Sequence, residues 1–247
     1  MKKYKYLLIS IILSGFLNEY PTYAQPIIDI ETGVVFTGYN YVRITGRNGT
    51  LFSLKDDLKT GPTYYNRFSL TYELKKRHMF SLLYAPLKIK SLGIINRDIL
   101  FKSTLFKANS NLEGTYKFNS YRFTYCYRFF NKPNFKISIG LTGKIRDANI
   151  KLESSNHSDE RTSVGFVPLI HFNSCYSKNN ISFLLIGDGL IASQGRAVDA
   201  QISFAYKWSD RFSSRIGYRV LEGGANGSSV YGFALFNYIS LGTSIRF

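Results

Sequence analysis

Histidine, cysteine and long apolar runs are all scarce in this sequence. Among 247 residues there are three histidines and two cysteines. A catalytic site built on an imidazole therefore has only His78, His157 and His171 as candidates. No apolar run of about 18 residues follows residue 25, which excludes a transmembrane helix from that part of the chain.

The first 24 residues have the layout of a cleaved signal peptide. Lys2, Lys3 and Lys5 precede the apolar run 7–16, and the small residue Ala24 lies before the expected cleavage site. This run is too short to cross a bilayer as a helix, so an uncleaved anchor is the weaker interpretation. We expect an exported chain that begins near Gln25 and forms one domain over residues 25–247.

The formal net charge is +16 at pH 7. Nucleic acid is the usual partner of so basic a protein, but an exported chain does not meet it. The basic residues are expected to serve the interior of the fold, the membrane rims and anionic lipid head groups, including lipopolysaccharide. No sequence pattern indicates a cofactor or a metal ion.

Ten segments after residue 25 alternate between apolar and polar side chains. In the clearest one, Tyr121, Phe123, Tyr125, Tyr127 and Phe129 alternate with polar or charged neighbours. A period of two predicts strands with one apolar face, and 20 Phe with 19 Tyr fit the aromatic girdles of membrane barrels. We expect an all-β fold: a single antiparallel transmembrane β-barrel of about ten strands. The pattern allows a count of eight to twelve.

The connections between these segments alternate in length. Longer ones cover 45–64, 91–112, 154–162, 194–197 and 222–229, and short turns lie near residues 76, 132, 178 and 210. This asymmetry is typical of outer-membrane barrels, with short periplasmic turns and longer external loops. A slip in the alternation at Asp147 predicts a β-bulge there, and Pro86 interrupts the third segment, whose faces stay unassigned.

The last ten residues alternate throughout and end on an aromatic residue. They resemble the terminal recognition strand that the barrel-assembly machinery reads in bacterial outer-membrane proteins, through Tyr238, Ser240, Gly242, Ile245 and Phe247. The resemblance implies export to the outer membrane of a Gram-negative bacterium and contact with that machinery during biogenesis. We expect the barrel to be monomeric.

The polar faces of the segments carry charges of both signs, which would point into the lumen. A salt-bridged plug is the leading interpretation, because ten strands lie close to the eight-stranded barrels that side chains can fill. A narrow pore lined by Arg and Lys that prefers anions is the alternative. The expected inward residues are Glu31, Glu73, Arg122, Arg128, Lys144, Arg146, Asp188, Asp199, Arg215 and Arg219, together with Asp29, Lys75, Lys136, His171 and Lys207.

An enzyme is the third interpretation, and its best candidates are His157 and Asp159. Omptin proteases use Asp and His at the level of the external loops, but here the order is His-x-Asp and only Asp56 and Asp57 could replace the missing acidic pair. Lipid A deacylase barrels use His-x-Ser on one strand. His171 and Ser174 have the wrong spacing for it, which puts them on opposite faces. We expect no enzyme activity.

Cys126 and Cys175 would point inward from the fourth and sixth segments. With a strand between them they should lie roughly 9–10 Å apart, which exceeds the reach of a disulfide. We therefore expect free thiols.

Four blocks resemble a family of uncharacterised bacterial outer-membrane barrels. They are Lys144-Ile-Arg-Asp-Ala148, residues 165–172, Gly195-Arg-Ala-Val-Asp199, and residues 217–224 with 233–238. The resemblance implies a fold and a location and brings no activity with it. The leading function is a structural or surface-interaction role for a barrel with a charged, largely filled lumen, the pore and an outer-membrane hydrolase being the alternatives.

Overall fold

The computed structural model describes residues 25–45 and 48–247 as an all-β chain. The expected signal peptide, residues 1–24, lies outside the described residues. The strands are β1 Gln25–Ile44, β2 Phe52–Ser53, β3 Lys59–Thr60, β4 Thr63–Leu74, β5 His78–Ala85, β6 Lys88–Ile94, β7 Ile99–Phe101, β8 Thr104–Phe106, β9 Asn111–Asn131, β10 Phe135–Glu153, β11 Ser158–Lys178, β12 Ile181–Ala192, β13 Gly195–Lys207, β14 Phe212–Asn226 and β15 Val230–Arg246.

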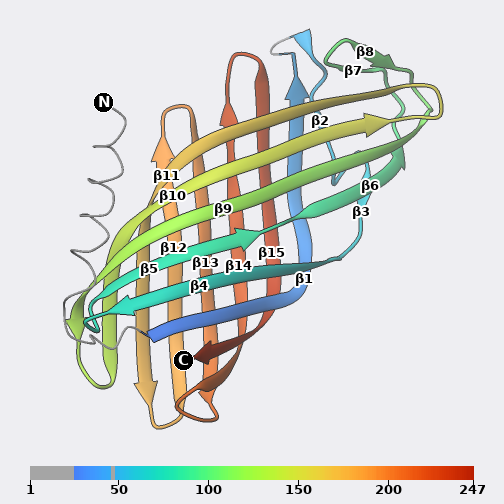
Figure 1. The fold of residues 1–247 in the computed structure, drawn as a ribbon. Coiled ribbons are helices and arrows are strands. Elements are labelled where there is room, and N and C mark those ends of the chain that lie inside the picture. Colours follow the sequence, from blue (N-terminus) through green and yellow to red (C-terminus); the bar gives the residue numbers. More distant parts are fainter. Residues whose placement is uncertain (1–24, 46–47) are drawn as a thin grey trace, which may run out of the picture.

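Ten strands close into an antiparallel barrel, as the sequence predicts. Each strand pairs with its chain neighbours, and β1 closes the ring by pairing with β15 from Ile27–Arg246 to Ile44–Val230. The third barrel strand is β5 followed by β6, because both pair with β9 on either side of the break at Pro86. Figure 1 shows the strands from β9 to β11 crossing the more upright strands from β12 to β15.

The predicted asymmetry is confirmed in part: one end has only short turns, and at the other end the β1–β4 and β6–β9 connections are long. The strands nevertheless continue past the predicted ends: only 154–157 separate β10 from β11, and only 227–229 separate β14 from β15. The predicted loops 154–162 and 222–229 were therefore too long, and the predicted loop 194–197 is a two-residue turn, because β12 ends at Ala192 and β13 begins at Gly195. Cross-strand hydrogen bonding extends these hairpins although their sequences are polar.

The bulge predicted at Asp147 is wrong. Asp147 pairs in continuous register with Asn119 and Val164. The register shifts instead opposite Ile137 and Ser138, where β9 carries Phe129 as an extra residue, and at Gly38 in β1. β10 extends beyond the apolar zone of the outer surface. Asp147 therefore interrupts the alternation of polar and apolar residues, while the hydrogen-bonded pairing of the strands continues past it.

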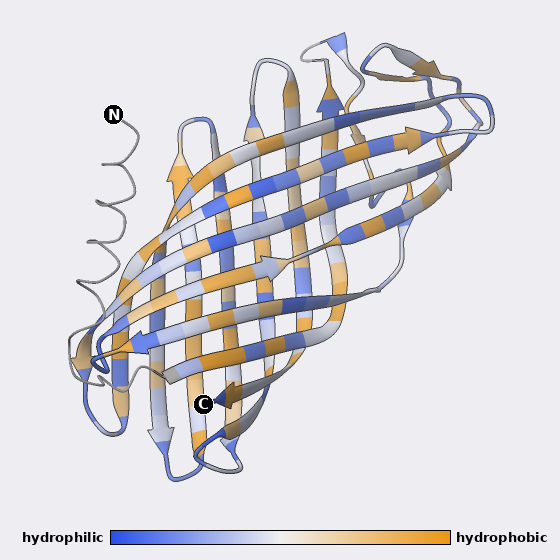
Figure 2. Ribbon diagram, viewed as in Figure 1, coloured by the Kyte–Doolittle hydropathy of each residue, from blue (hydrophilic) through white to orange (hydrophobic). Residues whose placement is uncertain are grey.

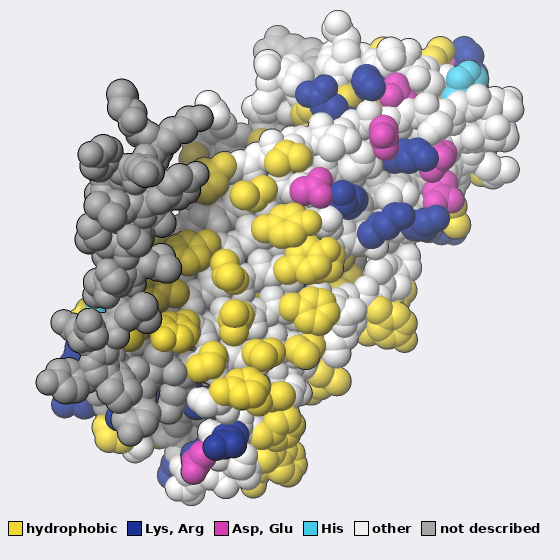
Figure 3. Space-filling view, in the orientation of Figure 1, with side chains coloured by type: hydrophobic (Ala, Val, Ile, Leu, Met, Phe, Trp, Pro, Cys, Tyr) yellow, Lys and Arg dark blue, Asp and Glu magenta, His cyan; other side chains and the backbone are white. Residues whose placement is uncertain are grey.

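The outer surface carries a broad apolar zone. Orange and pale residues alternate along each strand in Figure 2, and Figure 3 shows apolar side chains across the middle of the molecule with charged ones gathered towards its ends. Phe123, Leu141 and Phe166 are among the exposed members, at 52%, 68% and 70% exposure. Such a surface is unfavourable in water and fits hydrocarbon. Within residues 25–45 and 48–247, no helix is long and apolar enough to cross a membrane.

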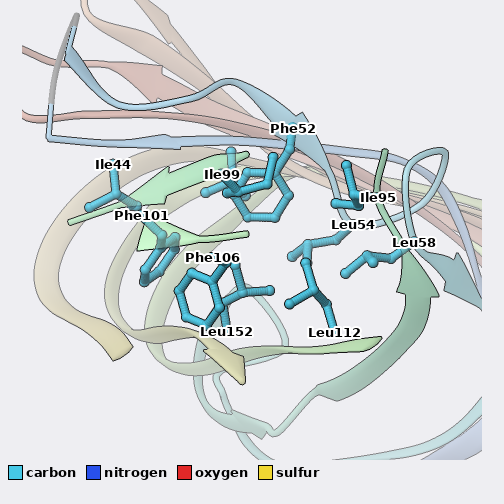
Figure 4. Packing of buried hydrophobic residues seen from close by; sticks show 11 residues of the cluster. Ile44, Phe52, Leu54, Leu58, Ile95, Ile99, Phe101, Phe106, Leu112 and Leu152 are labelled. Carbon is cyan, nitrogen blue, oxygen red and sulfur yellow. The ribbon is translucent and has the colours of Figure 1, made fainter. Parts of the chain in front are cut away.

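Residues 48–62 and 95–110 form a small folded cap at the external end, which the sequence did not predict. They contribute β2, β3 and the β7–β8 hairpin, and their apolar side chains share one core with the ends of β1, β9 and β10 (Figure 4). That core consists of Val42, Ile44, Phe52, Leu54, Leu58, Ile95, Ile99, Phe101, Phe106, Leu112 and Leu152. We call this unit the cap.

Candidate functional site in the barrel lumen

The lumen is organised in layers because inward side chains alternate with outward ones along each strand. On β1, the inward residues run from Asp29 and Glu31 through Val35 to Val42. The same order from charged to apolar holds from Arg219 to Leu221 on β14. Charged residues therefore fill the lower and middle lumen, and apolar residues lie nearer the cap.

Asp199 lies at the centre of the charged layer. Its carboxylate accepts hydrogen bonds from Arg122 at 2.6 Å and Arg219 at 2.6 Å, and from both terminal nitrogens of Arg67 at 3.3 Å. All four side chains are almost fully buried. A buried carboxylate with three guanidinium partners is compensated for its lost hydration, whereas an isolated one would not be.

Glu31 forms a second centre beside it. Arg219 bonds both of its oxygens at 3.1 Å, Arg215 donates at 3.0 Å, and the Gln201 amide donates at 2.9 Å. Arg215 also bonds Asp29, so the network continues towards the periplasmic end. The predicted inward charges Glu31, Arg122, Asp199, Arg215 and Arg219 thus belong to one connected ion-pair network.

Lys144 and Arg146 lie on β10 at the edge of this network. The ammonium of Lys144 lies 4.7 Å from the centroid of the Phe118 ring, a cation–π distance, and the side chain is buried. Arg146 donates to Ser163 Oγ at 3.0 Å. These two side chains add positive charge to a layer that already contains four buried or half-buried arginines.

Nearer the periplasm, Glu73 pairs with Arg128 at 2.6 Å, and Arg128 also contacts Met79 Sδ at 3.2 Å. Lys136 is half-buried in the same region. Lys75 and Lys207 were also predicted to point inward, but both lie at turns. Lys75 is exposed with a positive φ, and Lys207 pairs with the exposed Asp210. The alternation was extended one residue too far at these strand ends.

An apolar layer lies in the lumen between the charged residues and the cap. Apart from Leu87, its members come from β1, β4, β6, β14 and β15, and Tyr65 packs edge-on against Tyr238 with centroids 4.7 Å apart. A cavity of about 10 Å³ lies where the two layers meet, roughly the minimum for one water molecule. The layer consists of Val35, Tyr65, Leu87, Ile89, Leu221, Ala234, Phe236 and Tyr238.

A larger hollow of about 930 Å³ lies on the outer surface. Its apolar lining includes the exposed side chains of Ile30, Phe68 and Phe166. These residues belong to the lipid-facing zone, so this hollow is not a route through the barrel.

His171 and Asp188 form a polar pair in the lumen that the sequence had listed only as separate inward residues. Nδ1 of His171 lies 2.9 Å from Asp188 Oδ1, and that carboxylate also accepts from Thr142 at 2.7 Å and from Arg122 at 2.8 Å. Strand register brings these groups together, and register cannot be read from composition. Cys126 and Cys175 are both free thiols, as expected.

His157 and Asp159, the catalytic candidates, lie at the cap and do not act on each other. The His157 ring packs edge-on against Phe106, while Asp159 accepts from Lys102 at 3.2 Å and Thr104 at 3.0 Å. Partial burial opposes ionisation of Asp159, but these hydrogen bonds lower its pKa on balance. No hydrogen bond joins the two residues within the described part of the chain. The arrangement fixes the β10–β11 hairpin and lacks a base aimed at a nucleophile.

Asp56 and Asp57, considered as a substitute acidic pair, serve the cap. Asp57 holds Arg97 in a bidentate pair at 2.8 and 2.9 Å, and Asp56 accepts from Ser53 at 3.0 Å. Across residues 25–45 and 48–247, no group of three or more His, Cys, Asp or Glu side chains could hold a metal ion.

The residues of the predicted assembly signal have distinct places in the folded barrel. Tyr238 is in the apolar layer, and Ser240 is fully buried and accepts from Gln201 at 2.9 Å. A side chain at Gly242 would lie 2.4 Å from the guanidinium carbon of Arg215, so glycine leaves the room that Arg215 needs. Ile245 and Phe247 are exposed at the outer surface.

Comparisons with known proteins support the fold. No family model matches the chain, and no curated protein matches it. Among solved structures, the outer-membrane protease OmpT from Escherichia coli matches at 10% identity with a TM-score of 0.54, covering 90% of this chain and 97% of that one. The attachment invasion locus protein Ail of Yersinia pestis matches at 11% identity with a TM-score of 0.41, covering 90% of this chain and 99% of that one. Neisserial surface protein A matches at 12% identity with a TM-score of 0.38, covering 90% of this chain and 97% of that one.

The closed barrel with its apolar outer zone is an outer-membrane protein of a Gram-negative bacterium. A β-sheet can cross hydrocarbon only when its edges are paired, and the β1–β15 pairing meets that requirement.

Proposed function

We propose that this protein is a plugged outer-membrane barrel that displays the cap at the cell surface and catalyses no reaction. The observation that carries the proposal is the buried ion-pair network around Asp199 and Glu31, which the apolar layer and then the cap follow towards the external end. The role is structural, or one of interaction through the cap.

The energetics of the network support a permanent plug. Asp199 and Glu31 each hold at least two guanidinium groups at 2.6–3.3 Å, and both carboxylates are almost fully buried. Opening a path for an ion would separate buried charges from their partners, and leaving one such charge unpaired costs about 3–5 kcal/mol. Several pairs would have to separate together.

The cap supports an interaction role because it has a fixed shape. Phe101 and Ile99 are completely buried in its core, and Leu58 packs there from the other connection. Loops with such a core present their outer side chains in one arrangement, which lowers the entropic cost of binding a partner.

The outer rim of the barrel supports contact with anionic lipids, including lipopolysaccharide. Arg43 lies over the Tyr231 ring at 5.5 Å and Arg196 over the Phe233 ring at 4.9 Å, on the outward face at the external ends of the strands. Basic and aromatic side chains together fit the level of the lipid head groups.

Solute release from liposomes tests the plug. Vesicles containing the refolded protein and loaded with a small anionic dye, or with a neutral sugar, are expected to retain both as long as protein-free vesicles do. Vesicles containing a general porin are the positive control. Release of either solute at a rate that scales with the amount of protein would contradict the proposal.

A narrow anion-preferring pore is the second candidate, and the surplus of basic groups in the lumen favours it. Lys144 faces an aromatic ring and Arg146 a hydroxyl group, so neither is held by a carboxylate among the contacts that the structure shows. Release of the anionic dye with retention of the sugar would favour this candidate over the plug.

A further inference from the structure

Two inward cations without a carboxylate partner are neighbours on β10. Within residues 25–45 and 48–247, Lys144 and Arg146 form no ion pair. Asp147, between them in the sequence, points outward and pairs with Lys117 at 2.8 Å, so it does not neutralise them. The inward carboxylates are engaged with other arginines: Asp29, Glu31, Glu73, Asp188 and Asp199 pair with Arg67, Arg122, Arg128, Arg215 and Arg219.

Both side chains lean towards the external end and lie on either side of Ala148. The ammonium of Lys144 lies 4.7 Å from the centroid of the Phe118 ring, and Arg146 Nη2 donates to Ser163 Oγ at 3.0 Å. Ala148 pairs with Phe118 of β9 and with Ser163 of β11, so these three residues form one row across the strands. The methyl group of Ala148 occupies little of the space between the two cations.

The two cations and Ser163 have hydrogen-bond donors to spare. Lys144 is 3% exposed, and its contact is the face of an aromatic ring rather than an oxygen atom. Arg146 Nε is buried and has no hydrogen-bond partner in the described part of the chain. The Ser163 hydroxyl accepts from Arg146 and can donate its own proton elsewhere. Buried cations are costly unless an anion compensates them.

We propose that Lys144, Arg146 and Ser163 bind a small tetrahedral oxyanion of the phosphate type at the external end of the lumen. A guanidinium group, an ammonium group and a hydroxyl group are the donors that phosphate oxygens accept from, and an oxyanion has enough oxygens for all three. The three side chains point inward, whereas a phosphate of lipopolysaccharide lies at the outer face. The ligand is therefore an oxyanion from the external medium.

This site can be reached from outside the barrel. Outward residues at its level, such as Asp147 and Thr162, are polar, so the level lies beyond the apolar zone. β12 pairs with β11 only over Ile170–Lys178, and no strand of the described chain pairs on that side beside Ser163, which is half-buried. Arg161, exposed at the next inward position of β11, adds a positive charge that attracts anions. The site thus goes beyond the plugged-barrel proposal and does not depend on it, because binding requires no path through the lumen.

Calorimetric titration of the refolded protein in a non-ionic detergent with inorganic phosphate tests the site, at neutral pH and at an ionic strength held constant with sodium chloride. We expect one saturable phosphate site per barrel. Lys144→Gln and Arg146→Gln should each weaken binding by about tenfold or more, the order expected when a hydrogen bond to a charged group is lost. Lys136→Gln is the matched control, because it removes the same charge from a half-buried position near the periplasmic end of β10, and it should bind as the wild type does.

Ala148→Val separates a built site from a general positive field, because it retains every charge and fills the space between the two cations. We expect this variant to lose phosphate binding. The absence of saturable binding to the wild-type protein would overturn the proposal, as would equal weakening by Lys136→Gln and Lys144→Gln or wild-type affinity in Ala148→Val. If Lys144→Gln does not fold, Arg146→Gln and Ala148→Val, both at half-buried positions, decide the matter.

Discussion

Arg219 holds both carboxylate oxygens of Glu31, from Nε to Oε1 and from Nη2 to Oε2, each at 3.1 Å. The two residues belong to β14 and β1, which β15 separates, so this contact passes across the inner face of a strand. Two parallel hydrogen bonds to one carboxylate fix the guanidinium in orientation as well as position. The pair joins the two ends of the chain where the barrel closes.

Replacing Glu31 should therefore weaken the whole barrel. Glu31→Ala would leave Arg67, Arg215 and Arg219 without one of their shared partners, at a cost of about 3–5 kcal/mol in the free energy of unfolding. Urea unfolding of the refolded protein in detergent measures the change. Asp210→Ala, which removes an exposed pair with Lys207, is the control and should have no measurable effect. Equal unfolding midpoints for the two variants would be incompatible with a stabilising network.

The cap should respond to changes in its own core. Leu54 is 1% exposed and Leu51 is 47% exposed in the same connection, so the two leucines form a matched pair. Leu54→Ala should cost about 2–5 kcal/mol of local stability, because it leaves a cavity among packed side chains. Limited proteolysis between residues 45 and 64 measures the effect. Leu51→Ala should be cut at the wild-type rate, and similar rates for both variants would show that the cap has no packed core.

Acid should loosen the cap through Asp57. Partial burial would raise the pKa of this carboxyl, but hydrogen bonds from Arg97 and from the Ser53 amide lower it on balance below 3.8. A group with a lowered pKa stabilises the folded state above its ordinary pKa, and this contribution is lost as the pH falls through the folded value.

The expected window for this loosening thus lies below about pH 4. Hydrogen exchange at the Ser53 amide, which donates to Asp57 at 2.7 Å, provides the measurement. Asp57→Asn should raise the exchange rate at neutral pH and flatten its dependence on acid. Asp98 and Asp159, whose pKa values are also lowered, keep part of that dependence in the variant. An unchanged pH profile in Asp57→Asn would rule out the role of this carboxylate.

Gly242 should matter after assembly as well as during it. The Cβ of Gly242→Ala would collide with the Arg215 guanidinium, which bonds Asp29 and Glu31. We expect lower stability of barrels refolded in vitro, where no assembly machinery is present. Gly187→Ala is the control, because its Cβ would meet nothing closer than 3.7 Å. If the two variants have the same unfolding midpoint, Gly242 does not stabilise the folded barrel and is needed only during assembly.

The barrel was predictable because its information is local. A strand such as 120–129 shows its two faces in its own alternation, and the turns near 76, 132, 178 and 210 follow from chain spacing. The inward charges followed from the same alternation, apart from Lys75 and Lys207 at the strand ends. Their partners did not, because a residue's neighbours across the lumen depend on barrel closure and on register.

The cap and the cluster of Thr142, His171 and Asp188 could not be predicted for the same reason. Phe52 and Phe101 are isolated apolar residues in polar connections, where no period of two or 3.6 marks them as a core. Thr142 and Asp188 are 46 residues apart in the numbering, and only the pairings of β10 with β11 and of β11 with β12 bring them together. Long-range packing and strand register carry the information that alternation lacks.

Current through a planar bilayer containing the refolded wild-type protein tests the central claim most directly. The plugged lumen predicts no steady conductance steps, while Asp199→Ala, which would leave Arg67, Arg122 and Arg219 without their central partner, provides a barrel with a disturbed network for comparison. Silent wild-type barrels, shown to be folded by their heat-modifiable migration, would support the plug. Steady, ion-selective steps from the wild-type protein that change with Arg122→Ala or Arg215→Ala would contradict it and identify the lumen as a pore.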